Sequence, residues 1–321
     1  MTRRWQLPLL NEIAKSCGDD IRKCMNQREP DWSLYRSFLA VIREGSLSGA
    51  ARSLGLTQPT IARHIEALEQ SIGLELFVRS QQGLSPTEGA LELKPYAESL
   101  AATTAAMIRA ASGQGKAVKG AVRVSASEIM GAEVLPFILA GLRERHPQLE
   151  IELVLSNTVD NLLRREADIA VRMVEPVHEA LVIKRIGSVT IGLHAHRRYL
   201  ERAGRPRTLD ALQKHSMIGF DRETPEIRSM RERIQGLEQA VHFAFRTDSD
   251  IAQLMAIRAG FGIGFCQTAL ARRDPNLERV LPGAFQFKLG VWLAMHENLR
   301  STPRCRAAFD GLAAGLMSHL D

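Results

Sequence analysis

The most constraining feature of the sequence is a run of three short amphipathic segments near the N-terminal end of the chain. Apolar residues recur at helical spacing from Trp32, and the pattern predicts helices over 32–44, 47–54 and 58–72. A glycine follows each segment at once, as expected just past a helix end. These glycines are Gly45, Gly55 and Gly73. Helices this short need partners, so the three segments are expected to form one small packed unit.

The residues between these segments indicate how the unit continues. Ser46 and Thr57 stand where N-caps are expected, and Pro59 is tolerated in a first helical turn. Two extended pieces around a polar, glycine-containing turn then predict a hairpin over 76–86. Two short helices followed by a hairpin predict a winged helix-turn-helix domain over 31–90.

A domain of this kind binds double-stranded DNA, because its second helix enters the major groove with its N-terminal residues facing base edges. Gln pairs with adenine and Arg with guanine, while hydroxyls at helix starts suit phosphate oxygens. The candidate base readers are Gln58, Pro59, Thr60, Arg63 and His64. The candidate phosphate contacts are Ser46, Ser48 and Thr57, with Arg79 and the turn at 80–82 as the wing. Each residue alone is explained as well by helix capping or a solvated surface, but the set together predicts DNA binding.

A long, alanine-rich segment follows. Thr87 predicts the start of a helix over 88–111 that contains Pro95, and 112–116 predicts a flexible hinge. We assign 87–112 as a linker helix that packs against a partner. Because one recognition helix reads only a few base pairs, we expect a homodimer.

The periodicity changes after residue 120. Strands are predicted over 122–124, 149–155 and 168–173, and helices over 134–145, 159–165 and 304–316. Alternating strands and helices predict an α/β domain with largely parallel sheets. The expected fold class is therefore α/β overall, with an N-terminal all-α winged helix-turn-helix.

The N-terminal motifs resemble those of the LysR family of transcriptional regulators. The similarity lies in Gly45–Leu54, Leu56–Ile65 and Leu68-Glu69, and it continues from Leu74 to Gly89. Ala62 departs from the family, which usually has Ser at this position, and this shifts specificity onto Gln58, Thr60 and Arg63.

The family motif usually begins close to the initiator, whereas residues 1–30 precede it here. We hypothesise that Met25 is the native start and that 1–24 are an extension or a disordered arm. Cys17 and Cys24 lie in this segment. A redox pair is one hypothesis for them, and reduced thiols are the plainer one.

The resemblance implies that 120–321 form an effector-binding domain built like a periplasmic binding protein. Crossovers are expected near 187–194 and 263–268. Subdomain I would comprise 121–190 and 268–321, and subdomain II 191–267. The resemblance also implies that a bound effector controls DNA binding, that the protein forms dimers or tetramers, and that RNA polymerase is a further partner to consider.

Ligands of open α/β sheets bind outside the carboxyl ends of the strands, beside helix starts. This rule selects Ser127, Glu128, Asn157, Thr158, Arg172, Phe220, Thr247, Asp248 and Ser249. Arg172 and Arg246 favour a small anion, such as a carboxylate. Glu128, Asp248 and Asp250 would instead accept an amino group, so an amino acid stays open. Helix caps, structural ion pairs and core packing are the plain alternatives.

The net charge of +6 is unevenly distributed. Residues 31–112 carry seven basic and eight acidic side chains, whereas 113–321 carry a net charge of +5. The excess therefore fits an anionic effector better than a DNA track.

Other function classes find little support in the sequence. It contains no G-x-S-x-G, H-E-x-x-H or P-loop motif, so an enzyme is a weak alternative, and no metal or cofactor is predicted. A ligand-independent architectural DNA-binding protein is the other alternative. No apolar run of membrane-spanning length and no signal peptide occur, and the expected location is the cytoplasm.

Overall fold

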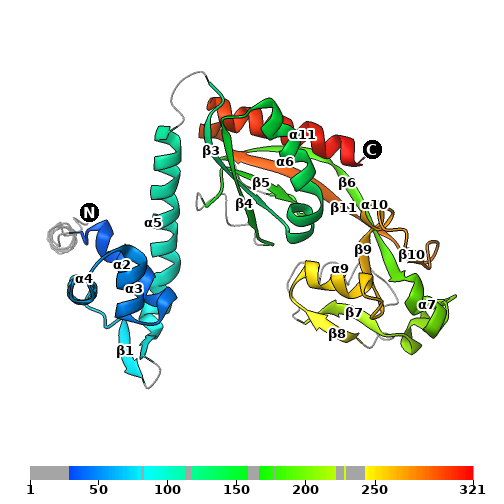
Figure 1. Ribbon diagram of the computed structural model, residues 1–321, viewed down its shortest axis with the longest axis horizontal. Coiled ribbons are helices and arrows are strands. Elements are labelled where there is room, and N and C mark those ends of the chain that lie inside the picture. The colour runs from blue at the N-terminus through cyan, green and yellow to red at the C-terminus, as the bar shows by residue number, and fades with distance from the viewer. Residues whose placement is uncertain are drawn as a thin grey trace, which may run out of the picture. The chain divides into compact units, whose positions relative to one another are not determined.

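A computed structural model describes residues 29–80, 83–112, 117–157, 166–176, 178, 180–221, 228 and 243–320. The expectations for Met25, residues 1–24, Cys17, Cys24 and Thr158 lie outside these residues, as do those for 81–82 of the wing and for the helix at 159–165. The chain divides into two compact units, one ending at Ala102 and one formed by Thr103–Asp321. The α/β class with N-terminal helices is confirmed (Figure 1).

The first unit contains the predicted helices and hairpin. Its elements are α2 (Trp32–Glu44), α3 (Leu47–Leu54), α4 (Gln58–Ile72), β1 (Phe77–Ser80), β2 (Gly83–Pro86) and the first part of α5 (Glu88–Ser112). Ser46 and Thr57 cap their helices, accepting hydrogen bonds from the amides of Gly49 and Thr60. The three predicted glycines end their helices in the left-handed conformation, at φ of 64, 66 and 71°.

The core of this unit forms where the apolar faces of the helices meet. Phe38, Val41, Ile61 and Leu68 are fully buried there. The hairpin is attached to the α2–α3 turn, because the Leu84 amide donates to the Gly45 carbonyl at 3.1 Å. Gly83 permits this approach: its φ is 123°, and a Cβ there would lie 2.9 Å from the Gly45 carbonyl oxygen.

The second unit is built on one long mixed sheet. Its strand order is β4-β3-β5-β11-β6-β9-β7-β8, with β10 paired to β6. The strands are β3 (Gly120–Ala126), β4 (Leu149–Leu155), β5 (Ile169–Arg172), β6 (Leu181–His196), β7 (Met217–Phe220), β8 (Phe243–Thr247), β9 (Ile263–Gln267), β10 (Leu277–Val280) and β11 (Phe287–His296). The expectation of a largely parallel sheet was wrong in part. β3, β4 and β5 are parallel, as are β7, β8 and β9, but β6 and β11 run antiparallel to all their partners.

Helical elements follow or cover the strands. They are η1 (Met130–Val134), α6 (Leu135–Arg145), α7 (Arg197–Ala203), η2 (Asp210–Lys214), α9 (Asp250–Arg258), α10 (Thr268–Ala271), η3 (Glu297–Leu299) and α11 (Pro303–Leu320). The element η1 is a π-helical turn that the sequence did not predict. It begins two residues after Glu128, and π-turns are frequent at functional sites.

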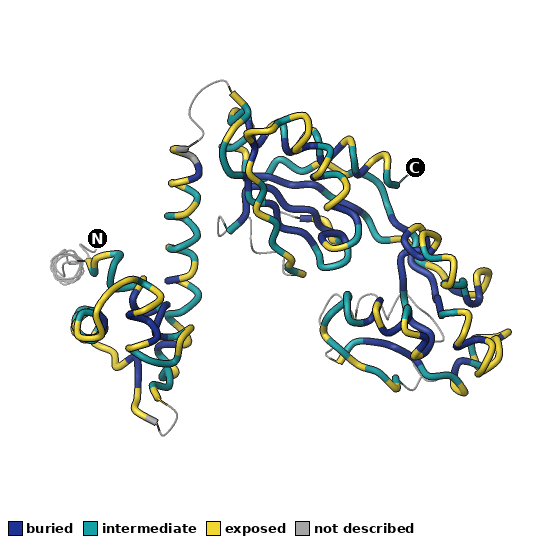
Figure 2. Tube along the Cα trace, in the orientation of Figure 1, coloured by how far each residue is buried: buried dark blue, intermediate teal, exposed yellow. Residues whose placement is uncertain are grey.

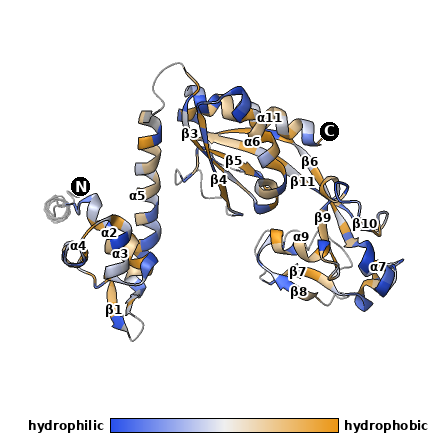
Figure 3. Cartoon of the chain, viewed as in Figure 1, coloured by the Kyte–Doolittle hydropathy of each residue, from blue (hydrophilic) through white to orange (hydrophobic). Residues whose placement is uncertain are grey.

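Separate apolar cores mark two halves of this unit. One core lies between α6, α11 and the β3–β5 end of the sheet, and the others surround β7 and β9 (Figures 2 and 3). Leu270 packs with Ile218 and Leu254, and Phe285 packs with Tyr199. By packing, residues 268–286 therefore group with the β7–β9 half, later than the boundary at 268 expected from the sequence. The chain returns to the first half along β11.

Candidate functional site

The N-terminal end of α4 presents polar side chains to solvent. Gln58, Pro59 and Arg63 are exposed and Thr60 is partly exposed, while Ile61, Ile65 and Leu68 are buried on the opposite face. The Ser48 hydroxyl donates to Gln58 Oε1 at 3.1 Å and so orients that amide. The helix therefore has one face for packing and one face that is available to a partner.

His64 differs from the other candidate base readers. Its Nδ1 lies 2.7 Å from the hydroxyl of Ser37, which is fully buried in α2. The same hydroxyl donates to the Ser33 carbonyl at 3.0 Å. Both contacts are satisfied together when Nδ1 of His64 carries the proton and donates to Ser37. This arrangement favours an anchoring role between α2 and α4 over base reading.

The remaining candidates of the first unit serve partly as caps. Ser46 and Thr57 use their side-chain oxygens at helix starts, and the Thr57 and Thr60 hydroxyls lie 2.8 Å apart. Ser48 is exposed on α3, and Arg79 is exposed on β1. These positions leave the hydroxyl of Ser48 and the guanidinium of Arg79 accessible to a phosphate, and their contact with DNA stays a prediction.

In the second unit, Arg172 ends β5 and is only 3% exposed. Its guanidinium donates to the Ser125 hydroxyl at 2.8 Å and to the Val171 carbonyl at 3.0 Å. Among the described residues, no carboxylate pairs with it and its Nε has no partner. Burial lowers the pKa of Arg172 to about 10, so the side chain remains cationic at neutral pH.

Ser127 lies beside this arginine. The β3–β5 register pairs Ala126 with Val171, so the residues that follow them, Ser127 and Arg172, are neighbours. The buried Ser127 hydroxyl also lacks a partner within the described chain. Gln267, at the end of β9, contributes another unpartnered oxygen, and its amide nitrogen contacts the sulfurs of Met130 and Met173 at 3.7 and 3.8 Å.

Acidic side chains that follow β3 and begin α9 connect the two halves of the second unit. Glu128 Oε2 accepts from the Ser249 hydroxyl at 2.9 Å and from the Ile251 amide at 3.3 Å, at the start of α9. Asn157 accepts from the Glu128 amide and donates to Asp250, both at 3.1 Å. Burial, with the negative charge of Glu128 adding to it, raises the pKa of Asp250 to about 6.

The other predicted effector residues are peripheral to these contacts. Thr247 accepts from the Ser249 amide at 3.2 Å, Asp248 and Arg246 are exposed, and Phe220 is partly buried at the end of β7. Sequence reasoning missed Ser125 and did not select Gln267. Local sequence offers no clear signal for either, because a polar residue at a strand end and a small residue within a strand are both common.

Neither a metal centre nor a membrane-spanning helix is found in the part of the chain that the structure describes. No cluster of three His, Cys, Asp or Glu side chains is arranged to hold a metal ion. No helix there is long and apolar enough to cross a bilayer.

The two units match two family models. Residues 32–91 match "Bacterial regulatory helix-turn-helix protein, lysR family", and residues 115–316 match "LysR substrate binding domain". Among relatives, the chain is 23% identical to the probable HTH-type transcriptional regulator LtrA of Klebsiella pneumoniae, over 88% of this chain and 93% of that one. It is 34% identical to the putative HTH-type transcriptional regulator PtxE of Stutzerimonas stutzeri, over 44% of this chain and 70% of that one.

Solved structures show the same fold. CbnR, a LysR family transcriptional regulator, superimposes with a TM-score of 0.65 at 17% identity, over 91% of this chain and 99% of that one. CbnR complexed with its target DNA gives 0.64 at 18% identity, over 89% and 99%. Since the two family models together cover most of the sequence, the chain belongs to the LysR family of DNA-binding transcriptional regulators with an effector-binding domain, and it is not an enzyme.

Proposed function

We propose that this protein binds operator DNA as a homodimer through α4 and that a small carboxylate effector, bound at Arg172, controls that binding. The observation that carries the effector class is the buried guanidinium of Arg172, which has no acidic partner among the described residues. Burying an unpaired charge costs several kcal/mol, so such a group is expected to have an anionic partner in the working protein.

For DNA, the reading set that we propose is Gln58, Thr60 and Arg63, with Ser46, Ser48 and Thr57 on phosphates and Arg79 on the wing. The exposure of Gln58 and Arg63 at the start of α4 supports this assignment. The first unit carries little net charge, so specificity has to come from placed side chains rather than from bulk attraction. His64 serves as an anchor in this proposal.

For self-association, α5 offers a large apolar surface. Tyr96, Met107 and Ile108 are 76, 65 and 66% exposed. A second copy of the helix would cover such side chains, and two recognition helices would then reach two half-sites. A tetramer and a contact with RNA polymerase are compatible with this arrangement, and a DNA-bound regulator of this kind would act in the cytoplasm.

An amino acid is the sharper form of the effector proposal. Ser127 and Arg172 would receive a carboxylate, while Glu128, the residue after Ser127, and Asp250 would receive an amino group. The raised pKa of Asp250 supports this, because a cationic group would relieve the repulsion between the two acids. Asn157 already lies between them, so the acidic pair is preorganised.

A thermal-shift screen tests the effector class. The full chain is heated with monocarboxylates, dicarboxylates and the twenty amino acids, each alongside its matched amide. A ligand that binds only the native state at one hundred times its Kd adds about 2.7 kcal/mol of stability. We expect a carboxylate to raise Tm while its amide does not, and Arg172→Lys to reduce the shift. Arg306→Lys, at an exposed site on α11, is the matched control and keeps it.

A DNA selection tests the other half. Duplexes are selected from a random pool with the full chain, and the best one competes against random duplex. We expect a clear preference for the selected duplex. Equal affinity for both would favour the architectural alternative and refute the regulator proposal.

A further inference from the structure

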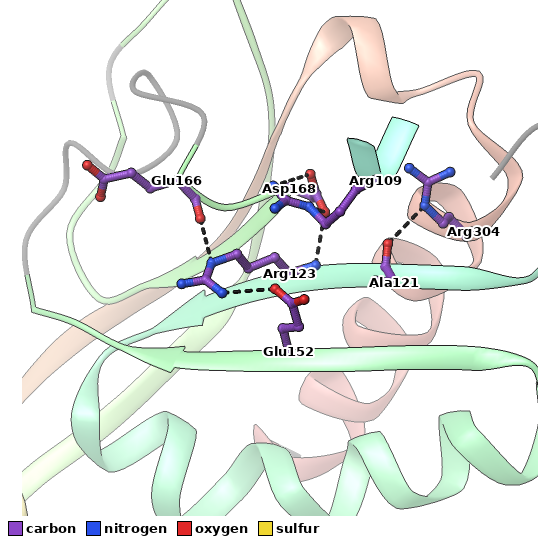
Figure 4. Close-up of polar contacts among 7 residues, drawn as sticks. All are labelled: Arg109, Ala121, Arg123, Glu152, Glu166, Asp168 and Arg304. Atoms are coloured by element: carbon purple, nitrogen blue, oxygen red, sulfur yellow. Dashed lines mark hydrogen bonds and ion pairs between the residues drawn. The ribbon is translucent and has the colours of Figure 1, made fainter. Parts of the chain in front are cut away.

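The last turns of α5 are fixed by a buried ion pair to the α/β part of the second unit, residues 117–320, which we call the sensor domain (Figure 4). Arg109 donates from Nε to Asp168 Oδ2 at 3.1 Å and from Nη2 to Oδ1 at 3.3 Å. The two residues are 7 and 4% exposed. Both belong to the compact unit formed by Thr103–Asp321. A two-pronged guanidinium–carboxylate contact fixes direction as well as distance, so the helix end is oriented on the sheet.

Asp168 is also the residue directly before β5, the strand that ends in Arg172. All four residues of β5 are buried, and the strand lies between β3 and β11. At about 3.3 Å per residue, the Cα atoms of Asp168 and Arg172 are about 13 Å apart. One short strand therefore has the linker-helix contact at one end and the proposed effector contact at the other.

Strand β3 is hydrogen-bonded to both of these side chains. The Arg123 amide donates to Asp168 Oδ2 at 2.9 Å, and the Ser125 hydroxyl accepts from Arg172 at 2.8 Å. Because close-packed interiors transmit strain rather than absorb it, a shift of the Arg172 end is expected to reach Asp168. Arg123 is itself held at its side chain, by the Glu166 carbonyl at 2.8 Å and by Glu152 at 2.8 Å (Figure 4).

We propose that Arg109 is a positioning residue through which the state of the effector pocket is passed to the linker helix, by way of Asp168 and strand β5. The inference rests on the proposed function only in assigning the pocket to Arg172. The Arg109–Asp168 pair then determines whether a change at that pocket alters the end of α5.

A second buried guanidinium constrains how the pair can be altered. Arg304 is 2% exposed and donates to the Ala121 carbonyl at 3.0 Å. The Cys305 thiol is close enough to respond to Arg304, Arg109 and Asp168; its pKa is raised to about 11 by burial first, then by the charge of Asp168. Removing Asp168 alone would leave the buried Arg109 without its carboxylate. A neutral, hydrogen-bonding replacement of both partners avoids this.

The test measures coupling without any ligand. Hydrogen exchange is followed in the full chain for residues 103–112, with residues 135–145 of α6 as the internal reference. Four proteins are compared: wild type, Arg172→Met, the pair variant Arg109→Gln/Asp168→Asn, and all three substitutions together. Arg306→Gln/Asp310→Asn, an exposed ion pair on α11, is the control for altering a charge pair.

In the wild-type background, Arg172→Met is expected to raise exchange at 103–112 at least about threefold relative to α6, within the range of coupling between linked sites. The pair variant is expected to exchange faster at 103–112 and to show no further rise with Arg172→Met. The control pair variant should keep the full rise. A structural role alone predicts additive effects instead.

No rise at 103–112 in the wild-type background, or an equal rise with and without the pair, would overturn the inference. Should the pair variant fail to fold, Arg109→Lys retains the charge but loses the two-pronged contact, and it is expected to weaken the response. A full response in Arg109→Lys would then overturn it as well. None of these outcomes depends on whether a carboxylate binds, so failure of the proposed effector class is recognised separately.

Discussion

Replacing Arg172 by Met is expected to stabilise the sensor domain while removing its response to effector. Binding sites often sacrifice stability for function, and a buried cation without an acidic partner is such a sacrifice. Met has a similar length and no charge. It retains apolar contact with the surrounding strands, where Val171 and Ile169 are fully buried.

The magnitude follows from the pKa of the arginine. Burial lowers the pKa to about 10, well below the ordinary value of an arginine, and this difference corresponds to about 3 kcal/mol at 1.36 kcal/mol per pKa unit. Losing the hydrogen bond to the Ser125 hydroxyl removes about 1 kcal/mol of this gain, and the Val171 carbonyl loses a donor as well. The net expectation is a gain of about 1–2 kcal/mol in the free energy of unfolding at neutral pH.

The direction of this pKa shift also predicts how the free energy of unfolding depends on pH. Between pH 10 and 12.5 the unfolded chain holds the proton that the folded chain releases, so wild-type stability gains a positive contribution with rising pH there. The variant lacks this contribution. The stability gain and the pH dependence are measured in the full chain by calorimetry and by urea unfolding followed with near-UV circular dichroism. Arg306→Met is the control. A loss of more than about 1 kcal/mol in Arg172→Met would refute the reasoning, because it would mean that the folded protein already compensates the charge.

Three further predictions concern other positions. Asp250→Asn should raise the free energy of unfolding at pH 7 by up to about 3 kcal/mol and flatten its pH dependence. The pKa of Asp250 in the folded protein is about 6, above the ordinary 3.8, so wild-type stability is lost as the pH rises from 3.8 to 6. Urea unfolding over a pH series measures this, and parallel curves for the two proteins would contradict it. Ser37→Ala should lower the free energy of unfolding of the first unit by about 1–3 kcal/mol, because it leaves His64 without its partner. The thermal transition of this unit measures the loss, and Ser71→Ala on α4 is the control that should cost little. Equal losses in the two variants would exclude the anchoring role of His64. Arg63→Ala should weaken binding to the selected duplex by about 1–3 kcal/mol, measured by fluorescence titration, while the fold stays intact. Arg36→Ala on α2 is the control and should weaken binding less. Matching losses in the two variants would exclude Arg63 from base reading.

Local signals made the first unit predictable. The helices α2, α3 and α4 each begin after a residue whose side chain caps them and end at a glycine, so Ser46, Thr57 and Gly45 define boundaries without help from tertiary contacts. The buried face of α4 follows from apolar spacing alone. What the sequence missed is the inward contact of His64, because a polar residue at the edge of an apolar stripe has the same spacing whether it binds a buried serine or a base.

The sensor domain was harder because its decisive contacts are long-range. Arg172 and Glu128 were selected from their places at strand ends. In the structure, Arg172 donates to the Ser125 hydroxyl and Glu128 accepts from the Ser249 hydroxyl. Their partners come from segments distant in sequence, as in the bond from Ser249 to Glu128 or the pair of Arg109 with Asp168. The boundary between the subdomains near residue 268 stays a prediction. Leu270 and Phe285, which follow it, belong to the apolar cores around β7 and β9, and this packing depends on tertiary pairing rather than on local pattern.

The most direct test of the account is the affinity for the selected duplex, measured by fluorescence anisotropy with and without the carboxylate that raises Tm most. The account predicts that this compound changes the Kd of the full chain for the duplex at least about fivefold, as expected for coupled sites. It also predicts that adding the compound leaves the Kd of Arg172→Met unchanged. An unchanged Kd in the wild type, or the same change in the variant, would contradict the claim that a carboxylate at Arg172 controls DNA binding.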